Sequence, residues 1–272
     1  MTKLSFLIPE GLSELKAKKD LVGNLIARDI RSRYKGSVLG LAWSILTPMM
    51  MLVVYTFVFS VVFKARWHGG SGSKTEFALL LFSGLVIFNI FAECINRSPS
   101  IIVSNPNFVK KVVFPVELLP VVILGTSLFQ GMMSFIVWLI FYMIFFGTPQ
   151  PTILLLPFVI FPMILFTLGF SWILASFSVY IRDIIQIIGV VTTILLFLSP
   201  VFYSISMLPE SFQIIMRINP LTTIIEQARD VMIWGKMLDI KIYVVQLVFS
   251  LLIFILGYSI FKNTKKGFAD VL

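Results

Sequence analysis

The sequence predicts an all-α integral membrane protein, and three observations carry the prediction. The 272 residues are 58% hydrophobic with a mean hydropathy of +0.98, whereas soluble domains are roughly 45–50% apolar. From Leu118 to Ile181 the chain holds no Asp, Glu, Lys or Arg. Runs of about 20 apolar residues, long enough to cross a bilayer as a helix, recur elsewhere. A charge near the bilayer centre costs about 2.5 kcal/mol or more, so the neutral block is typical of spanning helices.

Turn-forming residues divide the apolar runs into six transmembrane helices. The sequence Gly147-Thr148-Pro149-Gln150-Pro151 breaks the neutral block, and the pair Arg182-Asp183 ends one helix and opens the next. The spans predicted in this way are residues 41–63, 77–95, 116–146, 152–180, 184–203 and 242–261. No charge is expected in the hydrocarbon-spanning part of any of them, so no residue is visible for coupling transport to protons or sodium.

The basic residues favour one orientation. If the N-terminal segment, residues 1–40, lies inside, 15 of the 22 Lys and Arg residues fall on the inner side of the six spans and 7 on the outer side. Cytoplasmic loops carry the excess of Lys and Arg in membrane proteins. We therefore expect both termini, including the tail at residues 262–272, in the cytoplasm.

Two segments do not fit a plain bundle of six helices. Residues 12–34 alternate charges with apolar residues at helical spacing, which predicts an amphipathic helix at the membrane interface. Residues 204–239 are too polar to span and too apolar for a simple loop. We expect two short re-entrant helices there, broken near Asn219-Pro220 and dipping back from the outer side, because protein or water must cover irregular backbone at membrane depth. A surface-lying amphipathic hairpin is the alternative.

The residues needed for most enzyme chemistry are missing. Cys94 is the only cysteine and His68 the only histidine, which excludes intramolecular disulfides, cysteine-based metal sites and Cys/His catalysis within one chain. The glycine-rich stretch at 69–75 has the wrong spacing for a phosphate-binding loop, and no Gly-x-Ser-x-Gly marks a hydrolase. We expect a non-enzymatic chain with no cofactor and no metal of its own. Basic residues beside apolar spans report orientation, so no nucleic acid partner is expected.

The sharpest motif runs from Arg28 to Pro48 and reads R-D-x-x-x-R-Y-K-x-S-x-L-G-x-x-W-x-x-x-x-P. Taken alone, it is equally consistent with ordinary anchoring, with cations at the headgroup level and Tyr34 and Trp43 at the interface. The pattern resembles the opening of the membrane subunits of type-2 ABC exporters that move bacterial surface polysaccharides, notably O-antigen. Further matching groups follow in order: Asn105-Pro106 with Phe114-Pro115 and Leu119-Pro120, then Tyr180-Ile181-Arg182-Asp183-Ile184, then Ser199-Pro200-Val201-Phe202-Tyr203 with Asn219-Pro220-Leu221.

The resemblance implies a partner that supplies energy. Exporters of this kind are homodimers of the membrane subunit with two copies of a separate ABC ATPase, which holds ATP and Mg²⁺. They lie in the bacterial inner membrane and move a polysaccharide on an undecaprenyl pyrophosphate carrier out of the cytoplasm. By the same resemblance, residues 98–109 form the coupling segment, and the residues expected to contact the ATPase are Ser98, Ile101, Asn105, Asn107, Lys110 and Lys111.

Three further sets of site residues follow from chemistry combined with this resemblance. A pyrophosphate needs cations at the inner membrane surface, and Arg makes bidentate phosphate contacts; the residues expected there are Arg28, Arg31, Arg33 and Lys35. Sugar rings stack on aromatic side chains, and the residues expected to line the glycan channel are Tyr55, Phe59, Phe88, Phe91, Phe202 and Tyr203. An outer gate is expected from three residues on one helix face: Glu226, Arg229 and Asp230. Structural packing for the aromatic residues and a surface ion pair for the gate are the alternatives.

Several functions stay open at this point. The substrate can be O-antigen, capsule or teichoic acid, although charge-poor walls favour a neutral glycan over a polyanion. A membrane glycan ligase or polymerase would need a catalytic group in the outer loops, where only a few acidic residues and His68 are available. A proton-coupled transporter would need a titratable residue within a span, and none is expected.

Overall fold

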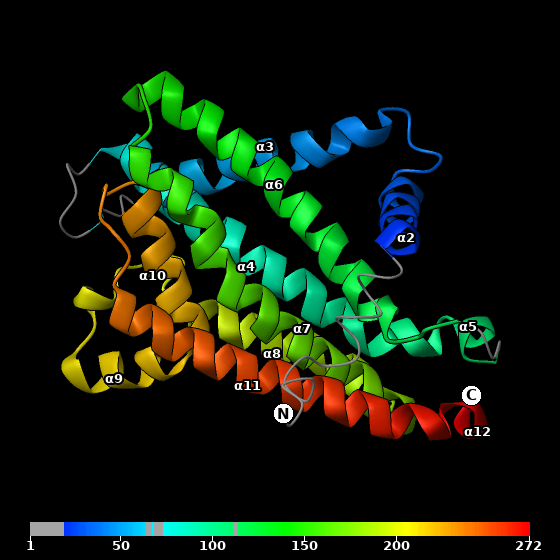
Figure 1. Cartoon of the computed structure of the whole chain (residues 1–272). Helices are drawn as coiled ribbons and strands as arrows, with labels where there is room; N and C mark the ends of the chain where they lie inside the picture. The colour runs from blue at the N-terminus through cyan, green and yellow to red at the C-terminus, as the bar shows by residue number, and fades with distance from the viewer. Residues whose placement is uncertain (1–18, 64–66, 68–72, 111–113) are drawn as a thin grey trace, which may run out of the picture.

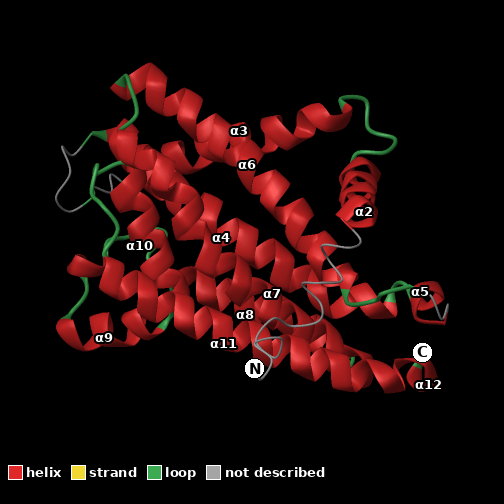
Figure 2. Ribbon diagram, in the orientation of Figure 1, coloured by secondary structure: helices red, strands yellow, loops and turns green. Residues whose placement is uncertain are grey.

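The computed structural model describes residues 19–63, 67, 73–110 and 114–272, and Figure 2 shows that every regular element in these ranges is a helix. The prediction of an all-α fold is confirmed for this part of the chain. In chain order the elements are α2 (Lys19–Arg33), η2 (Gly40–Ala42), α3 (Trp43–Tyr55), the π-helical η3 (Thr56–Val62), α4 (Lys74–Val103), α5 (Pro106–Lys110), α6 (Leu118–Phe146), η4 (Pro151–Leu155), α7 (Leu156–Tyr180), α8 (Ile184–Phe197), η5 (Ile205–Met207), α9 (Glu210–Ile218), α10 (Pro220–Met232), α11 (Ile240–Thr264), η6 (Lys265–Gly267) and α12 (Phe268–Val271).

Within the described residues, five helices are long and apolar enough to cross a membrane. They are Gly40–Phe59, Lys74–Val103, Leu118–Phe146, Pro151–Tyr180 and Ile240–Val271. A helix rises about 1.5 Å per residue and the hydrocarbon layer is about 30 Å thick, so each of these lengths is sufficient. The fold is therefore that of a multi-pass membrane protein.

The predicted fifth span, residues 184–203, forms a shorter helix than expected. The apolar helix α8 has 14 residues and ends at Phe197, and residues 198–203 form turns. Pro200 explains the early end, because a proline donates no backbone hydrogen bond and disfavours helical geometry in the residue before it. At about 1.5 Å per residue, α8 alone does not reach across the hydrocarbon layer.

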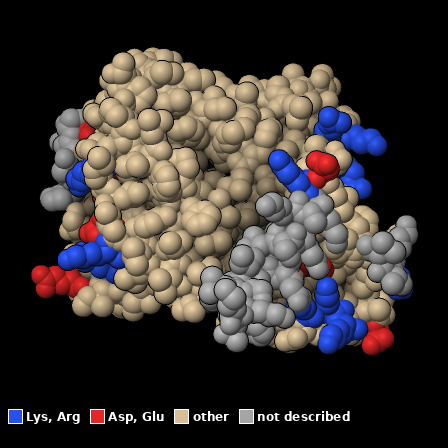
Figure 3. Space-filling view, in the orientation of Figure 1, with Lys and Arg blue, Asp and Glu red and all other residues tan. Residues whose placement is uncertain are grey.

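The chain runs back and forth between two ends of the molecule (Figure 1). One end is formed by α2, α5 and α12, and we call it the basic end; α9 and α10 lie at the opposite end. In Figure 3 the charged side chains gather at these two ends, and the described residues that are visible between them carry none. This separation suits a protein whose middle lies in hydrocarbon and whose ends meet water and headgroups.

Helix α4 is the centre of the fold. It contacts α6, α7, α8 and α10, and it is the most deeply buried of the five candidate spans. Two tryptophans link the helices around α4 through their indole N–H groups. Trp138 of α6 donates to the carbonyl of Leu79 in α4 at 3.1 Å, and Trp172 of α7 donates to the carbonyl of Glu117, just before α6, at 3.0 Å. Both indole rings are at most 1% exposed, so their N–H groups need these partners.

Helices α7 and α11 meet backbone to backbone. A Cβ atom added to Gly257 would lie 2.1 Å from the carbonyl oxygen of Gly169, and one added to Gly169 would lie 2.5 Å from the carbonyl oxygen of Ile253. Glycines allow helix backbones to approach this closely in membranes. On the same pair of helices, the ring of Trp172 packs 5.1 Å from the ring of Tyr258.

Local sequence explains where the shorter elements begin and end. Gly147, at φ +81°, ends α6, and Pro151 begins η4. The break between α9 and α10 lies at Asn219, whose Oδ1 accepts a hydrogen bond from the N–H of Leu221 at 3.0 Å. Pro220 follows as the first residue of α10, where its missing N–H costs nothing.

Two predicted segments differ in extent from the helices observed. The amphipathic helix predicted over 12–34 is described from Lys19, as α2, and its first part lies outside the described residues. The coupling segment predicted at 98–109 is not one element. Helix α4 continues through Val103, with Pro99 accommodated inside it, and the separate helix α5 has only 5 residues.

Candidate functional site

Helix α2 is tied to α4 by charged side chains at the basic end. Arg97 of α4 donates to both carboxylate oxygens of Asp29 at 2.9 Å, and Arg33 of α2 pairs with Glu93 of α4. Arg97 also lies 3.7 Å from Glu93. Hydrogen bonds between charged groups are stronger than those between neutral ones, so this cluster fixes the position of α2.

The four residues expected at the pyrophosphate are only partly free for that role. Arg33 is committed to Glu93, and the guanidinium of Arg28 lies 5.9 Å from the ring centre of Phe108. Arg31 and Lys35 are exposed, and neither forms an ion pair within the described residues. The structure therefore leaves Arg31 and Lys35 as the accessible cations of this set.

The expected ATPase-contact residues also divide into two groups. Ser98 is fully buried and donates to the carbonyl of Cys94 at 2.6 Å. Ile101 and Asn105 are half-buried, and the amide of Asn105 donates to the carbonyl of Ile101 at 2.9 Å. Asn107 and Lys110 are exposed residues of α5, and Lys111 lies outside the described residues. The accessible surface of this segment is thus α5.

The expected channel aromatics form one cluster and two outliers. Phe202 lies 6.4 Å from Tyr55 and 5.2 Å from Phe59 between ring centres, which brings the turns after α8 against α3 and η3. Tyr203 adjoins them in sequence and donates to the carbonyl of Phe197 at 2.6 Å. Phe88 and Phe91 do not join this cluster. They are 3% and 4% exposed and belong to the core around α4.

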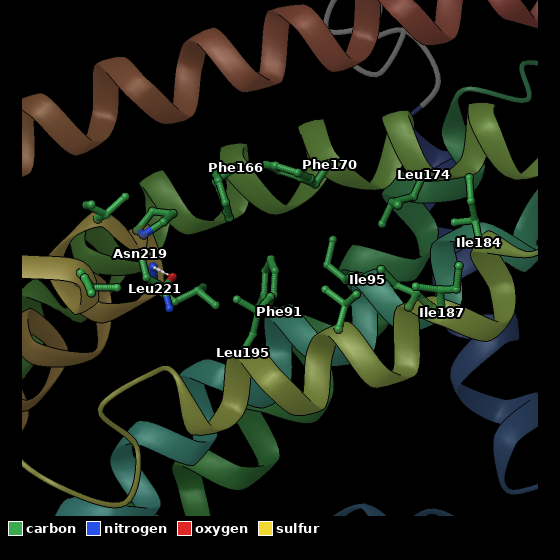
Figure 4. Close-up of a pocket in the computed structure, with 15 residues that line it drawn as sticks. Phe91, Ile95, Phe166, Phe170, Leu174, Ile184, Ile187, Leu195, Asn219 and Leu221 are labelled. Carbon is green, nitrogen blue, oxygen red and sulfur yellow. Dashed lines mark hydrogen bonds between the residues drawn. The ribbon is translucent and has the colours of Figure 1, made fainter. Parts of the chain in front are cut away.

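An apolar cavity of about 590 Å³ lies among α4, α7, α8 and α9. Figure 4 shows Phe166 and Phe170 of α7 and Leu195 of α8 facing it from either side, with Phe91 of α4 between them. Asn219 lines its end near α10. A lining of this composition suits hydrocarbon and offers almost nothing to a sugar.

A second cavity, of about 440 Å³, lies between α3, α4 and α6 and has a different character. Its α4 wall carries Asn89, Glu93 and Asn96, and its α6 wall carries Ser127 and Gln130. The volume lies within the range of ~300–1,000 Å³ typical of ligand pockets. Met51, Phe82, Leu85 and Val86 also face this cavity, so its lining mixes polar and apolar groups, and its walls are helices long enough to span the membrane.

Two charged residues, Glu93 and Arg97, lie toward the basic end of the candidate span Lys74–Val103, whose 30 residues exceed the roughly 20 that cross the hydrocarbon layer. They are tolerated because Glu93 pairs with Arg33 and Arg97 pairs with Asp29, so no charge stands alone. The sequence-based predictions did not include the amide side chains that line this cavity, Asn89, Asn96 and Gln130. The signal that could have revealed them was the occurrence of Asn and Gln within otherwise apolar runs.

The three residues expected to form an outer gate do not pair with one another. Arg229 is 3% exposed and donates to main-chain carbonyls: Nε to Leu80 at 3.0 Å, one Nη to Pro200 and the other to Val201 at 2.9 Å. Its guanidinium also lies 4.4 Å from the ring centre of Trp67. Burial lowers the pKa of Arg229 to about 9, so the side chain stays cationic at neutral pH.

The two acidic members of the expected gate line a pocket of about 450 Å³ beside Arg229. Asp230 pairs with Lys236 at 3.1 Å. Burial raises the pKa of Glu226 above its ordinary value, although Arg229 and Arg217 oppose the shift. Arg229 thus joins α10 to α4 and to the turn after α8, whereas Glu226 and Asp230 face a polar pocket at the opposite end.

Comparisons with known proteins agree with this architecture. A family model described as "ABC-2 type transporter" matches residues 21–233. The chain is 26% identical to the "O-antigen export system permease protein RfbA" of Klebsiella pneumoniae, over 93% of this chain and 95% of that protein. The protein of the same name from Myxococcus xanthus is also 26% identical, over 94% and 97%. The "Polysialic acid transport protein KpsM" of Escherichia coli is 22% identical, over 94% and 97%.

The chain belongs to the ABC-2 type transporter family. Within it, the chain is most like the permease subunits of O-antigen export systems. It is a transport subunit and not an enzyme, and its family implies pairing with an ABC ATPase subunit.

Proposed function

We propose that this chain is the permease of an exporter that moves undecaprenyl-pyrophosphate-linked polysaccharide, of the O-antigen type, from the cytoplasm across the bacterial inner membrane. The observation that carries the proposal is its similarity to O-antigen export permeases over nearly the whole chain. A permease for another surface glycan is the second candidate, supported by the weaker similarity to a polysialic acid transport protein.

The proposed assembly is a homodimer with two ATPase subunits that hold ATP and Mg²⁺. Apolar side chains stand exposed on α3 and α8, including Val53, Val190 and Phe197. Large exposed apolar surfaces mark lipid or protein contacts, and we assign part of this surface to the second copy. The exposed residues of α5, Asn107 and Lys110, are the proposed ATPase contacts.

In the proposed topology the basic end is cytoplasmic. It carries α2, α5 and α12, and an excess of Lys and Arg is typical of the cytoplasmic side. With α8 counted as a short fifth crossing, six crossings place both termini there. Helices α9 and α10 are then the re-entrant helices of the outer side, and Arg229 adds hydrogen bonds to the apolar packing of α10 on α4.

The lipid carrier is proposed to meet the protein at the basic end. Its pyrophosphate would bind Arg31 and Lys35, which are exposed beside the membrane interface, because a dianionic headgroup needs cations that are not already neutralised. Arg33 and Arg28 are assigned a supporting role, since their side chains already contact Glu93 and Phe108.

The deciding experiment is reconstitution. The chain is purified with the ATPase encoded beside its gene and placed in proteoliposomes loaded with undecaprenyl-pyrophosphate-linked glycan. ATP-dependent appearance of glycan on the far side supports the proposal. Transport that requires a proton gradient and not ATP would contradict it, and so would transport of a polyanionic glycan in preference to a neutral one.

A further inference from the structure

One face of α4 is polar where the rest of the helix is apolar. Asn89, Glu93 and Asn96 stand at positions i, i+4 and i+7, which places them in one row along the helix. Asn89 and Asn96 are exposed and Glu93 is half-buried, although α4 is otherwise the most deeply buried of the candidate spans. The row extends from the middle of the span toward the basic end.

Two of these side chains lack the partners that hydrocarbon would require. Within the described residues Asn89 makes no hydrogen bond, and Asn96 only accepts one, from the hydroxyl of Thr192 at 2.9 Å. An amide transferred to an apolar environment without a partner costs about 2 kcal/mol or more. Exposed amides at this depth therefore indicate water, a polar ligand or a polar surface of the second copy rather than lipid.

The wall opposite the row has the same chemistry. Ser127 of α6 is fully buried, lines the cavity, and its hydroxyl has no hydrogen-bond partner within the described residues. Gln130 lies beside it and is held in place, because it accepts a hydrogen bond from Tyr34 at 3.0 Å and donates to the carbonyl of Ser44 at 3.1 Å. Tyr55 of α3 contributes an aromatic ring to the same lining.

The charge of this lining is balanced. Glu93 is the acidic residue of the cavity, and it faces the guanidinium groups of Arg33 and Arg97. The groups left to bind a ligand are amides and hydroxyls, which both donate and accept hydrogen bonds. A hydroxyl-rich neutral molecule matches that set, whereas an ion would find no uncompensated charge.

We propose that the row Asn89–Glu93–Asn96 is a water-filled, hydrogen-bonding wall of the transport path, which neutral sugar residues contact as they cross. That sugar contacts this wall rests on the proposed function. That the wall is in contact with water does not, because it follows from the exposure of the amides. The proposed wall shares Tyr55 with the aromatic lining predicted from sequence but does not include Phe88 and Phe91, which are buried in the core.

Cysteine labelling tests the presence of water directly. Asn89→Cys and Asn96→Cys are reacted with a charged methanethiosulfonate reagent in the purified complex with its ATPase. The native Cys94 is 0% exposed and provides a silent background. Leu252→Cys on α11, 61% exposed among apolar residues, is the lipid-facing control, and Ile87→Cys, fully buried on α4, is the buried control.

We expect the two row cysteines to react at least about tenfold faster than the cysteine of the Leu252→Cys control, because the reactive thiolate forms only where water is present. Equal rates for the row and this control would overturn the proposal, since the row would then face lipid or a dry interface. Melting temperatures of all variants identify any that fail to fold. Asn89→Ser, which is not labelled but stays polar, checks that loss of the amide alone does not unfold the chain.

Export measurements then test whether the glycan passes along the row. A bulky adduct on either row cysteine should reduce glycan export at least about tenfold if the row lines the path, while the same reagent on Leu252→Cys leaves it unchanged. Labelled row cysteines with normal export would overturn the assignment to the path. If the wild-type complex exports no glycan at all, the proposed function fails together with the sugar, whereas fast labelling would still support the water-filled wall.

Discussion

Arg229 of α10 donates a hydrogen bond from Nε to the main-chain carbonyl of Leu80 in α4, with the two atoms 3.0 Å apart. Gly84 permits this approach, because a Cβ atom there would lie 2.5 Å from the guanidinium. This side chain thus adds a polar contact to the apolar packing between α10 and the central helix. Its removal measures what that contact contributes.

We expect Arg229→Met to destabilise the protein by about 3 kcal/mol or more, because three buried carbonyls lose their donor and each such loss costs about 1–3 kcal/mol. Thermal unfolding in detergent measures the change. Arg217→Met on the exposed face of α9 is the matched control and should leave the melting temperature unchanged. Equal melting temperatures for both variants would mean that Arg229 does not hold α10 in place.

Gly257→Ala tests the backbone contact between α7 and α11. The added methyl would lie 2.1 Å from the carbonyl oxygen of Gly169, so the helices must separate. We expect a loss of about 2–4 kcal/mol, in the range of overpacked cores. Gly189→Ala on α8, where nothing lies within 4 Å of the new Cβ, should be neutral or slightly stabilising. A wild-type melting temperature for Gly257→Ala would contradict the close contact.

The raised pKa of Glu226 predicts a pH dependence of stability. Burial disfavours its charged form in the folded state, so the folded protein binds more protons than the unfolded one above the ordinary pKa of 4.5. Stability from this residue is therefore present at low pH and lost as the pH rises through its folded pKa. Glu226→Gln should melt at a higher temperature than the wild type at pH 8, and the gain should vanish below pH 4.5.

The control for this pH series is Glu210→Gln on the exposed start of α9. It should leave the melting curve unchanged at every pH. If Glu226→Gln lowered the melting temperature at pH 8, attraction to Arg229 and Arg217 would outweigh the effect of burial.

A double-mutant cycle on Asp29 and Arg97 measures how firmly α2 is attached to α4. Both side chains are partly exposed, at 24% and 31%, so the coupling should be modest, about 0.5–1 kcal/mol. Asp29→Asn and Arg97→Gln, alone and together, are compared by thermal unfolding. Coupling should fall as salt is raised, because partly exposed charges are screened. Strictly additive effects would show that the contact contributes nothing.

Charge reversal separates lipid binding from helix anchoring at the basic end. The double variant Arg31→Glu/Lys35→Glu should reduce export at least about tenfold with little change in melting temperature, since these exposed cations have no intramolecular ion pair within the described residues. Arg33→Glu should instead lower the melting temperature, because it opposes Glu93. Normal export by the double variant would remove Arg31 and Lys35 from the proposed headgroup site.

Hydropathy and turn chemistry were sufficient to predict the class of fold and the approximate positions of the long helices. Those signals are local, and they predict where Gly147 ends a helix and where Asn219 begins one. The partners of Arg229 could not be predicted, because its acceptors are carbonyls of Leu80, Pro200 and Val201, and every residue has a carbonyl.

The functional row on α4 was missed for a different reason. Charges and aromatic rings are the usual sequence signals of a transport path, whereas Asn89 and Asn96 stand within an apolar run. Whether an amide inside a span is buried, paired or exposed depends on how α3 and α6 pack around it, and spacing along one helix does not contain that information. The burial of Phe88 and Phe91 likewise could not be inferred from their spacing along the helix.

The contact between Gly169 and Gly257 restricts which parts of the molecule can move. Backbone touching backbone leaves no flexible side chain to absorb a sliding motion, so α7 and α11 must rotate together as one rigid lever. Helix α3, in contrast, packs mainly on α6 and reaches α4 through the π-helical η3. If the cavity between α3, α4 and α6 widens during transport, we therefore expect the change at η3 and not between α7 and α11.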